Sequence, residues 1–262
     1  MCAYRPPSVR NFKLFIGELT AEAAAVHISL LESKKCEHKN EMYWSERAID
    51  ACIKLDGIKS ERVLNSQNRL AIVSLYSGFD LFLEEIESEC KHFGFQWKKN
   101  DKTSPLVILQ NNFTKKILNQ THFQYKSDSV DYFRLLRNSI AHPSAECENK
   151  AIHYYNSKQN ALCYLRDKYK MISAPSAPNN LSFHDVKFWC QFLIDFTEQI
   201  AEHLEPTKKM IFNSIPFDTW RKYGGRHDRI KNAAKNYIRS QYSYKLDECN
   251  EIIDSFYDDS LA

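Results

Sequence analysis

The chain has 262 residues, 43% of them hydrophobic and 26% charged, which is enough apolar material for a packed core and argues against global disorder. The formal net charge of +3 does not by itself imply a polyanionic partner. Six glycines in the whole chain are about a third of the usual roughly 7%, and neither the GxGxxG nor the GxxxxGKS/T pattern occurs. These features argue against glycine-rich phosphate-binding folds and favour long helices over many short strands.

Apolar residues recur at steps of three and four along most of the chain, which is the period of an amphipathic helix. The pattern is strongest in the third and sixth of the predicted helices. Gly94 is a suitable stop for the former, and Ser182 is a suitable cap for the latter, with Asp185 at its N3 position. The predicted helices are 20–31, 45–55, 60–90, 105–118, 129–141 and 182–205.

Two tyrosine-rich runs flank a polar turn between Ala151 and Met171, and this arrangement suggests a small β-hairpin. The fold class that we predict is therefore all-α, an up-and-down helical bundle with a small β-hairpin insertion and a helical C-terminal extension. The predicted divisions are an N-terminal helical segment (1–59), the bundle (60–205) and the extension (206–262).

The eight cysteines are scattered and include no CxxC pair. Pro6-Pro7 and nearby charged residues stand where a secretory signal would have its apolar region. No uncharged apolar run approaches the roughly 20 residues that a membrane helix needs. We therefore expect a cytoplasmic protein with reduced thiols and no membrane contact.

The segment 135–143 reads LLRNSIAHP and carries the most specific chemistry. On a helix, Arg137, Asn138 and His142 fall within an arc of about 140°, away from the stripe of apolar residues. His142 comes last, before Pro143, where the negative end of the helix dipole favours the imidazolium form. Arginine holds phosphate oxygens and histidine moves protons near pH 7, so the segment predicts a phosphate-handling site. The inward-facing stripe of this helix is Val130, Phe133, Leu136 and Ile140.

Arg137-Asn138-x-x-x-His142 resembles the R-polar-x(3–5)-H motif of the HEPN superfamily, helical-bundle domains that often act as ribonucleases. The upstream stretch LYSGFDLFLEE is similar to the helix that packs beside the motif in those domains. The resemblance covers about 60–205. It implies metal-independent RNA cleavage without a cofactor at a dimer interface, in a homodimer or a heterodimer with another such domain. It also implies a supporting acid, for which Asp80 is the nearest equivalent and Glu84 a poorer one.

By this resemblance the protein is expected to be an endoribonuclease. His142 would act as general base or acid, Arg137 would stabilise charge on the phosphorane, and Asn138 would orient the phosphate or the histidine. The resemblance further suggests a toxin–antitoxin or antiviral-defence (abortive infection) effector, held inactive by an inhibitory or sensor partner.

Arg and His at this spacing are common by chance, and Arg221 with His227 also satisfies the bare spacing. The latter pair is disfavoured because Gly224-Gly225 lies between the two residues. A plainer alternative for the motif is that Arg137 pairs with a surface acid and His142 merely closes the helix. The alternative function is a non-catalytic HEPN-like module that binds RNA or assembles a complex.

From Trp220 to Lys245 the chain has eight basic residues, one acidic residue and several aromatic ones, a composition that suits RNA binding. The alternative is a solvated helix face whose rings pack on the bundle. The six acidic residues after Lys245 suggest a segment that folds back on the cations as a nucleic-acid mimic. The predicted RNA contacts are Arg221, Lys222, Arg226, Arg229, Lys231, Lys235 and Arg239.

No metal site is predicted. Asp80, Glu89 and Lys91 are spaced like part of a metal-dependent nuclease triad, but Asp80 and Glu89 point to opposite sides of one helix. The Cys-x-His pairs lack partners at zinc-site spacing.

Overall fold

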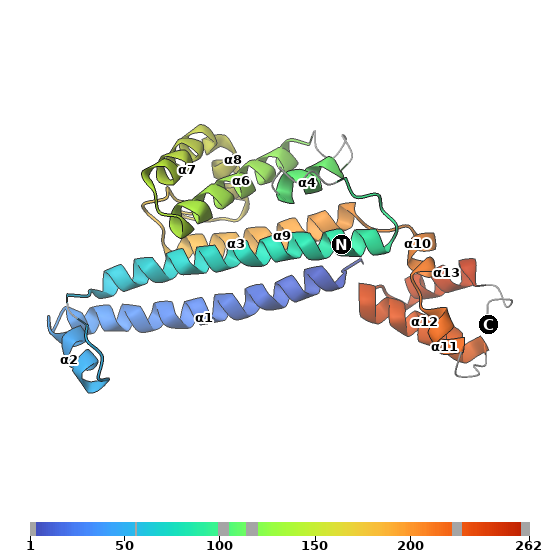
Figure 1. The fold of residues 1–262 in the computed structure, drawn as a ribbon, viewed down its shortest axis with the longest axis horizontal. Coiled ribbons are helices and arrows are strands. Elements are labelled where there is room, and N and C mark those ends of the chain that lie inside the picture. Colours follow the sequence, from blue (N-terminus) through green and yellow to red (C-terminus); the bar gives the residue numbers. More distant parts are fainter. Residues whose placement is uncertain (1–3, 56, 99–104, 114–119, 222–226, 258–262) are drawn as a thin grey trace. The chain divides into compact units, whose positions relative to one another are not determined.

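The computed structural model describes residues 4–55, 57–98, 105–113, 120–221 and 227–257 (Figure 1). Its regular elements are all α-helices, and no strand occurs among those residues, so the all-α prediction is confirmed. In chain order the helices are α1 (Pro7–Glu37), α2 (Tyr43–Asp50), α3 (Ser60–His92), α4 (Pro105–Asn111), α6 (Thr121–Ala141), α7 (Ala145–Ser157), α8 (Gln159–Lys168), α9 (Phe183–His203), α10 (Lys208–Asn213), α11 (Phe217–Arg221), α12 (His227–Tyr242) and α13 (Leu246–Phe256).

The two strongest predicted helices form where their start and stop signals lie. Gly94 has a φ of +81° just beyond α3, which is the left-handed conformation that ends many helices. At the start of α9 the Ser182 hydroxyl accepts from the His184 amide at 3.2 Å, and the Asp185 carboxylate accepts from the Ser182 amide at 2.9 Å. The two side chains therefore satisfy amide groups at this helix terminus, as the sequence predicted.

The predicted hairpin between Ala151 and Met171 is wrong, because the same residues form the end of α7, all of α8 and the turn that follows. The polar stretch between the tyrosine-rich runs is the junction of these two helices. Tyrosines of the segment pack against tyrosines of α6, with ring centroids 5.3 Å apart for Tyr132 and Tyr155 and 5.2 Å apart for Tyr125 and Tyr164. These aromatic residues therefore serve helix packing.

The chain forms two compact units, and each unit is built from segments that alternate along the sequence. Unit 1 comprises 1–13, 80–115 and 195–262, and unit 2 comprises 14–79 and 116–194. The long helices α1, α3 and α9 each contribute residues to both units. Segments of the two units alternate along the sequence. The three predicted divisions of the chain stay a prediction.

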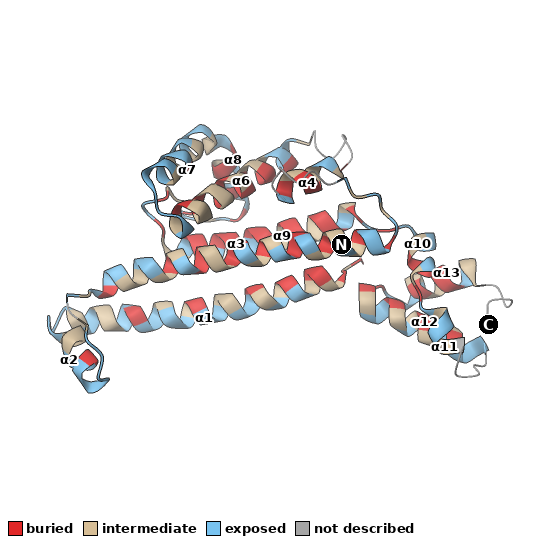
Figure 2. Ribbon diagram, in the orientation of Figure 1, coloured by how far each residue is buried: buried red, intermediate tan, exposed pale blue. Residues whose placement is uncertain are grey.

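Unit 2 has an aromatic core built by α3, α6 and α9. Phe133 of α6 stacks on Trp189 of α9, with ring centroids 4.1 Å apart, and its other neighbour is Tyr76 of α3 at 5.3 Å. Phe133 and Trp189 have no exposed surface, and burial is frequent along α3 and α9 (Figure 2). A Cβ on Gly78 would lie 2.1 Å from the Phe15 ring, so α1 and α3 approach closely there. This core fixes the inner face of α6, and with it the motif at the end of that helix.

Unit 1 joins the start of the chain to its end. Tyr4 is buried against Tyr242 and Tyr244, and the Arg5 amide donates to the Tyr242 carbonyl at 2.9 Å. Glu89 accepts from the amide and hydroxyl of Ser8 at 2.8 and 2.7 Å, near the start of α1. The N-terminal residues are therefore part of the same unit as the C-terminal extension.

Helix α1 is, among the residues that the structure describes, the one helix long and apolar enough to cross a membrane by length and composition. An 18-residue window within it has a mean hydropathy of 1.5, and 17% of that window is buried. Glu18 and Glu22 interrupt the apolar sequence of this helix, so it contains no long uncharged run. Core helices of soluble proteins and signal sequences share this length and composition.

Candidate active site

The motif lies where α6 gives way to α7. His142 is the C-cap of α6, with φ −127° and ψ 73°, and its amide donates to the Asn138 carbonyl at 2.9 Å. Pro143 prevents the helix from continuing, since it has no amide hydrogen. Ser144 then caps α7, because its hydroxyl accepts from the Cys147 amide at 3.2 Å. The predicted helix end is therefore in place, and it presents His142 as an exposed side chain.

Arg137 and Asn138 are in direct contact. The Arg137 Nη1 donates to the Asn138 Oδ1 at 3.0 Å, and the guanidinium carbon lies 5.9 Å from the centre of the Tyr76 ring on α3. Both side chains are half-buried. The Arg137 Nε is buried and has no hydrogen-bond partner among the described residues. A buried, unsatisfied N–H of a cation costs free energy, so the Arg137 guanidinium has hydrogen-bonding capacity that the described residues do not use.

Within one chain the structure joins only part of the predicted catalytic set. Arg137 and Asn138 are joined by a hydrogen bond. The His142 side chain has no hydrogen bond to either of them in the described structure. Of the predicted inward stripe, Val130, Phe133 and Leu136 are buried and Ile140 is half-buried. Arg137 and Asn138 are thus half-buried beside this stripe, and His142 is exposed at the end of the helix.

A cavity of about 280 Å³ adjoins the motif. Ser139 and Pro143 line it from the end of α6, Ser144 and Glu148 from α7, and Arg69 from α3. Arg69 was not predicted as a site residue. It precedes Tyr76 by seven residues, which is two helical turns, so both lie on the same face of α3. The sequence does not show that Tyr76 contacts Arg137, so this spacing could not have placed Arg69 near the motif before the structure was known.

The far wall of this cavity is the loop with Pro178 and Asn179, and Asp185 holds that loop. The carboxylate accepts from the Ser176 amide at 2.7 Å and from the amide and hydroxyl of Ser182 at 2.9 and 3.1 Å. Asp185 has no exposed surface, and burial raises the pKa of its carboxyl above the usual value although these hydrogen bonds act in the opposite direction.

Asp185→Asn is expected to lower the free energy of unfolding by about 1–3 kcal/mol, because the amide group would face a donor and leave it unsatisfied. Asp167→Asn, an exposed carboxyl on α8, is the matched control. Because its pKa is raised, the folded protein holds the carboxyl proton of Asp185 more tightly than the unfolded chain does. The contribution of Asp185 to the free energy of unfolding therefore declines as pH rises above about 3.8, the ordinary pKa of this carboxyl. The difference between wild type and variant in urea unfolding is therefore expected to shrink from pH 4 to pH 8. Identical unfolding midpoints for wild type and Asp185→Asn would contradict the role of this residue.

The predicted supporting acids stay predictions. Asp80 is half-buried and Glu84 is exposed on α3, and both belong to unit 1, whereas the motif belongs to unit 2.

The basic segment belongs to unit 1. Arg229 and Arg239 are exposed on α12, while Lys231 and Lys235 are half-buried. Arg221 ends α11, and its side chain is not described. Lys222 and Arg226 lie outside the described residues. Of the predicted RNA contacts whose side chains are described, two are thus exposed to solvent and two are half-buried.

The rings of this segment are largely engaged in packing. Tyr242 and Tyr244 are buried, and Trp220 packs edge-on against Tyr237 with centroids 6.0 Å apart. The part of the segment left for nucleic-acid contact is therefore mainly its cations. Tyr223 lies outside the described residues.

The acidic C-terminal segment forms α13, which packs against α12 and α10. Glu251 pairs with Lys208, outside the basic segment, and Glu248 accepts from the Lys245 amide at 2.8 Å to cap its own helix. Asp258 and Asp259 lie outside the described residues. Mimicry of a nucleic acid by this segment stays a prediction.

Two further predictions concern alternatives to the motif. Arg221 and His227 lie on separate helices, α11 and α12, and so do not reproduce the geometry of the motif. Glu89 bonds Ser8, and Lys91 pairs with Glu87 at 2.5 Å. No group of three or more potential metal ligands occurs in the part of the chain that the structure describes.

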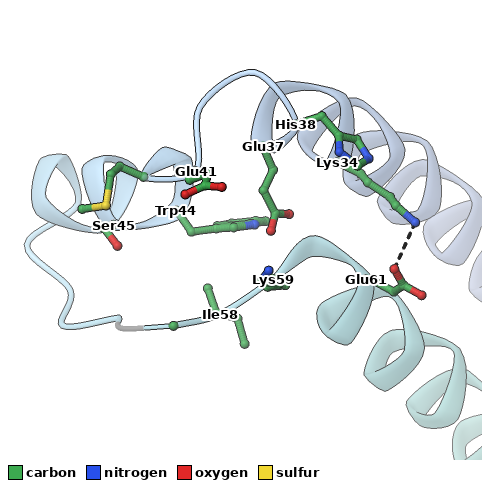
Figure 3. A pocket seen from close by; sticks show the side chains of 11 residues that line it. Lys34, Glu37, His38, Glu41, Trp44, Ser45, Ile58, Lys59 and Glu61 are labelled. Carbon is green, nitrogen blue, oxygen red and sulfur yellow. Dashed lines mark hydrogen bonds and ion pairs between the residues drawn. The ribbon is translucent and has the colours of Figure 1, made fainter.

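A larger pocket, of about 530 Å³, lies between the end of α1, α2 and the start of α3 and does not include the motif (Figure 3). The residues that line this pocket form hydrogen bonds and an ion pair with residues of neighbouring helices. The Trp44 indole donates to the Ser60 hydroxyl at 2.9 Å, the Ser60 amide donates to Glu37 at 2.8 Å, and Lys34 pairs with Glu61 at 3.2 Å. The hydrogen bonds from Ser60 also hold the pKa of Glu37 below its usual value. These contacts make the pocket a junction that joins α1, α2 and α3.

Comparison of the chain with protein-family models, curated proteins and solved structures finds no match. The chemistry of the site is therefore the basis for assigning a function.

Proposed function

We propose that the protein is a metal-independent endoribonuclease of the HEPN type, with Arg137, Asn138 and His142 as its catalytic residues. The observation that carries the proposal is the state of Arg137, a guanidinium held by Asn138 with a buried Nε that has no partner among the described residues. The exposed His142, one helical turn beyond Asn138, supplies an imidazole that can serve as general base or acid.

In the proposed reaction an RNA 2′-hydroxyl attacks the adjacent phosphorus, and its proton passes to His142. The bond from phosphorus to the 5′-oxygen breaks, and that oxygen takes a proton from a general acid. Arg137 stabilises the negative charge of the phosphorane, and Asn138 holds the guanidinium in place. The products are a 2′,3′-cyclic phosphate and a 5′-hydroxyl.

The proposal includes a homodimer through the motif helix. Within one chain no hydrogen bond joins His142 to Arg137 or Asn138 in the described structure, so a second motif would supply the missing half of the groove. We extend the proposal to a cytoplasmic toxin or antiviral-defence effector that a partner protein restrains.

The second candidate function is a non-catalytic module that binds RNA or assembles a complex. The lack of a hydrogen bond from the His142 side chain to Arg137 or Asn138 in the described structure favours it as long as no second copy completes the site. Basic residues exposed on α12 also suit RNA binding without cleavage.

The purified protein is expected to cleave single-stranded RNA in the presence of EDTA and to leave 2′,3′-cyclic phosphate ends, which mass spectrometry detects. A matched oligonucleotide with a 2′-deoxy nucleotide on the 5′ side of the cleaved bond is expected to resist, because it has no attacking hydroxyl. Cleavage of that oligonucleotide at the same bond would refute the mechanism. Binding of both oligonucleotides without cleavage of either would favour the second candidate.

A further inference from the structure

The most apolar stretch of α1 is largely left uncovered by its own chain. The window with mean hydropathy 1.5 is only 17% buried, and Figure 2 shows most of α1 as exposed or intermediate. Leu14, Ile28 and Leu31 are 68%, 61% and 40% exposed. Monomeric proteins seldom expose a continuous apolar surface of this kind, so such a surface indicates a contact.

These residues belong to a seam with a seven-residue repeat, in which Ala24 is half-buried and the other members are exposed. Leu14, Ala21 and Ile28 are seven residues apart, and Gly17, Ala24 and Leu31 lie between and beyond them at the same interval. This alternation of three and four is the pattern of the a and d positions in a coiled coil. At 1.5 Å per residue the seam from Leu14 to Leu31 is about 26 Å long. We call these six residues the α1 seam.

The core of unit 2 uses a different face of the helix. Ile16, Ala23 and Leu30 are buried, and Thr20 and His27 contact Cys190 and Phe183 of α9. The α1 seam therefore remains available while α1 is fully packed in its own unit. A Cβ at Gly17 would meet nothing within 4 Å, so another backbone has room to approach there.

We propose that the α1 seam binds the α1 seam of a second copy of this chain, with the two helices antiparallel. The charges beside the seam select this direction. Glu18 flanks its N-terminal half and Lys35 follows its C-terminal end. An antiparallel pair with its two-fold axis near Val26 brings each Glu18 beside the second copy's Lys35, whereas a parallel pair in register sets like charges side by side.

The existing contact of Lys35 does not prevent this pairing. Lys35 pairs with Glu32 at 2.7 Å, but both side chains are well exposed, at 69% and 63%. Such surface ion pairs contribute little to stability and exchange readily.

A lipid bilayer fits the α1 seam less well than a second helix does. Glu18, Glu22 and Glu32 are exposed on or beside it, and carboxylates are expensive at membrane depth. The small Gly17 and Ala21 favour close approach of a helix, which lipid does not require.

The first test measures the mass of the full chain by sedimentation velocity. Ile28→Lys is expected to halve the mass of the wild-type assembly with unchanged helicity, because Ile28 is exposed within one chain. Ile49→Lys is the matched control, since Ile49 is 74% exposed on α2, outside the seam, and this variant is expected to keep the wild-type mass. A monomeric wild type, or an assembly unaffected by Ile28→Lys, would overturn the proposal. So would a monomer that binds phosphatidylcholine vesicles through Ile28.

The second test reads the direction of the helices. In a full-length background with Cys2, Cys36 and Cys52 changed to serine, Gly17→Cys and Lys35→Cys variants are mixed and mildly oxidised. A disulfide-linked heterodimer is expected from the mixture, and no linked dimer is expected from Leu14→Cys alone. Efficient linking of Leu14→Cys to itself would indicate a parallel pair and overturn the proposal. The inference is distinct from the proposed ribonuclease, because the variants alter α1 and leave the motif helix α6 unchanged, and neither test reads cleavage.

Discussion

His142→Ala is expected to lower the rate of RNA cleavage by about 10²–10⁴-fold, the usual contribution of a general acid or base. The side chain is exposed at the end of α6, and the Asn138 carbonyl bonds the backbone of His142, not its ring. The variant is therefore expected to retain wild-type helicity and thermal stability. The measurement is the initial rate of cleavage of a labelled RNA in EDTA, at equal concentrations of folded protein.

His122→Ala is the matched control for this variant, because His122 is an exposed histidine in the first turn of the same helix. It is expected to cleave at the wild-type rate. In cells, expression of wild type and His122→Ala is expected to arrest growth, and expression of His142→Ala is not. Undiminished cleavage by His142→Ala would remove the proposed mechanism.

Phe133→Ala is expected to lower the free energy of unfolding by about 3–5 kcal/mol, the usual cost of removing a fully buried aromatic ring. Phe133 has no exposed surface and stacks on Trp189 with centroids 4.1 Å apart, so the cavity would open between α6 and α9. The measurement is urea unfolding followed by circular dichroism.

The control for the core variant is Ile172→Ala, since Ile172 is 90% exposed and its loss is expected to change stability little. Phe133→Ala is also expected to reduce RNA cleavage, because α6 carries the motif. The two effects are distinguishable, since His142→Ala loses activity without losing stability. A Phe133→Ala protein as stable as wild type would show that the stack contributes little to unit 2.

The sequence predicted the helices whose burial is one-sided. The stripe with Phe133 and Leu136 faces the core of unit 2, so the helical period of its apolar residues could be recognised in the sequence. Pro143 marked the end of the motif helix. Helix α1 was predicted at 20–31 but extends over Pro7–Glu37. Its apolar residues occupy both the buried face and the α1 seam, so no single amphipathic stripe marked its full length.

Long-range contacts explain most of what the sequence left out. Arg69 is near the motif because α3 packs beside α6, and no local pattern in the sequence encodes that neighbour. The hairpin was predicted from tyrosines, which favour β-strands. In the structure these tyrosines lie on helices and pack against tyrosines of α6, a long-range contact that outweighs the local preference. The contact between Arg137 and Asn138 follows from their adjacency, whereas the exposure of His142 depends on how the turn into α7 is made.

The docking of the first residues against the last ones affects how the protein is made. Arg10 donates to the backbone carbonyls of Ser240 and Gln241, 230 and 231 residues further along the chain. These contacts form only after the ribosome has synthesised residues 240 and 241, so unit 1 cannot be completed while the preceding part of the chain is being translated. Until then Tyr4 and its neighbours remain exposed on the nascent chain.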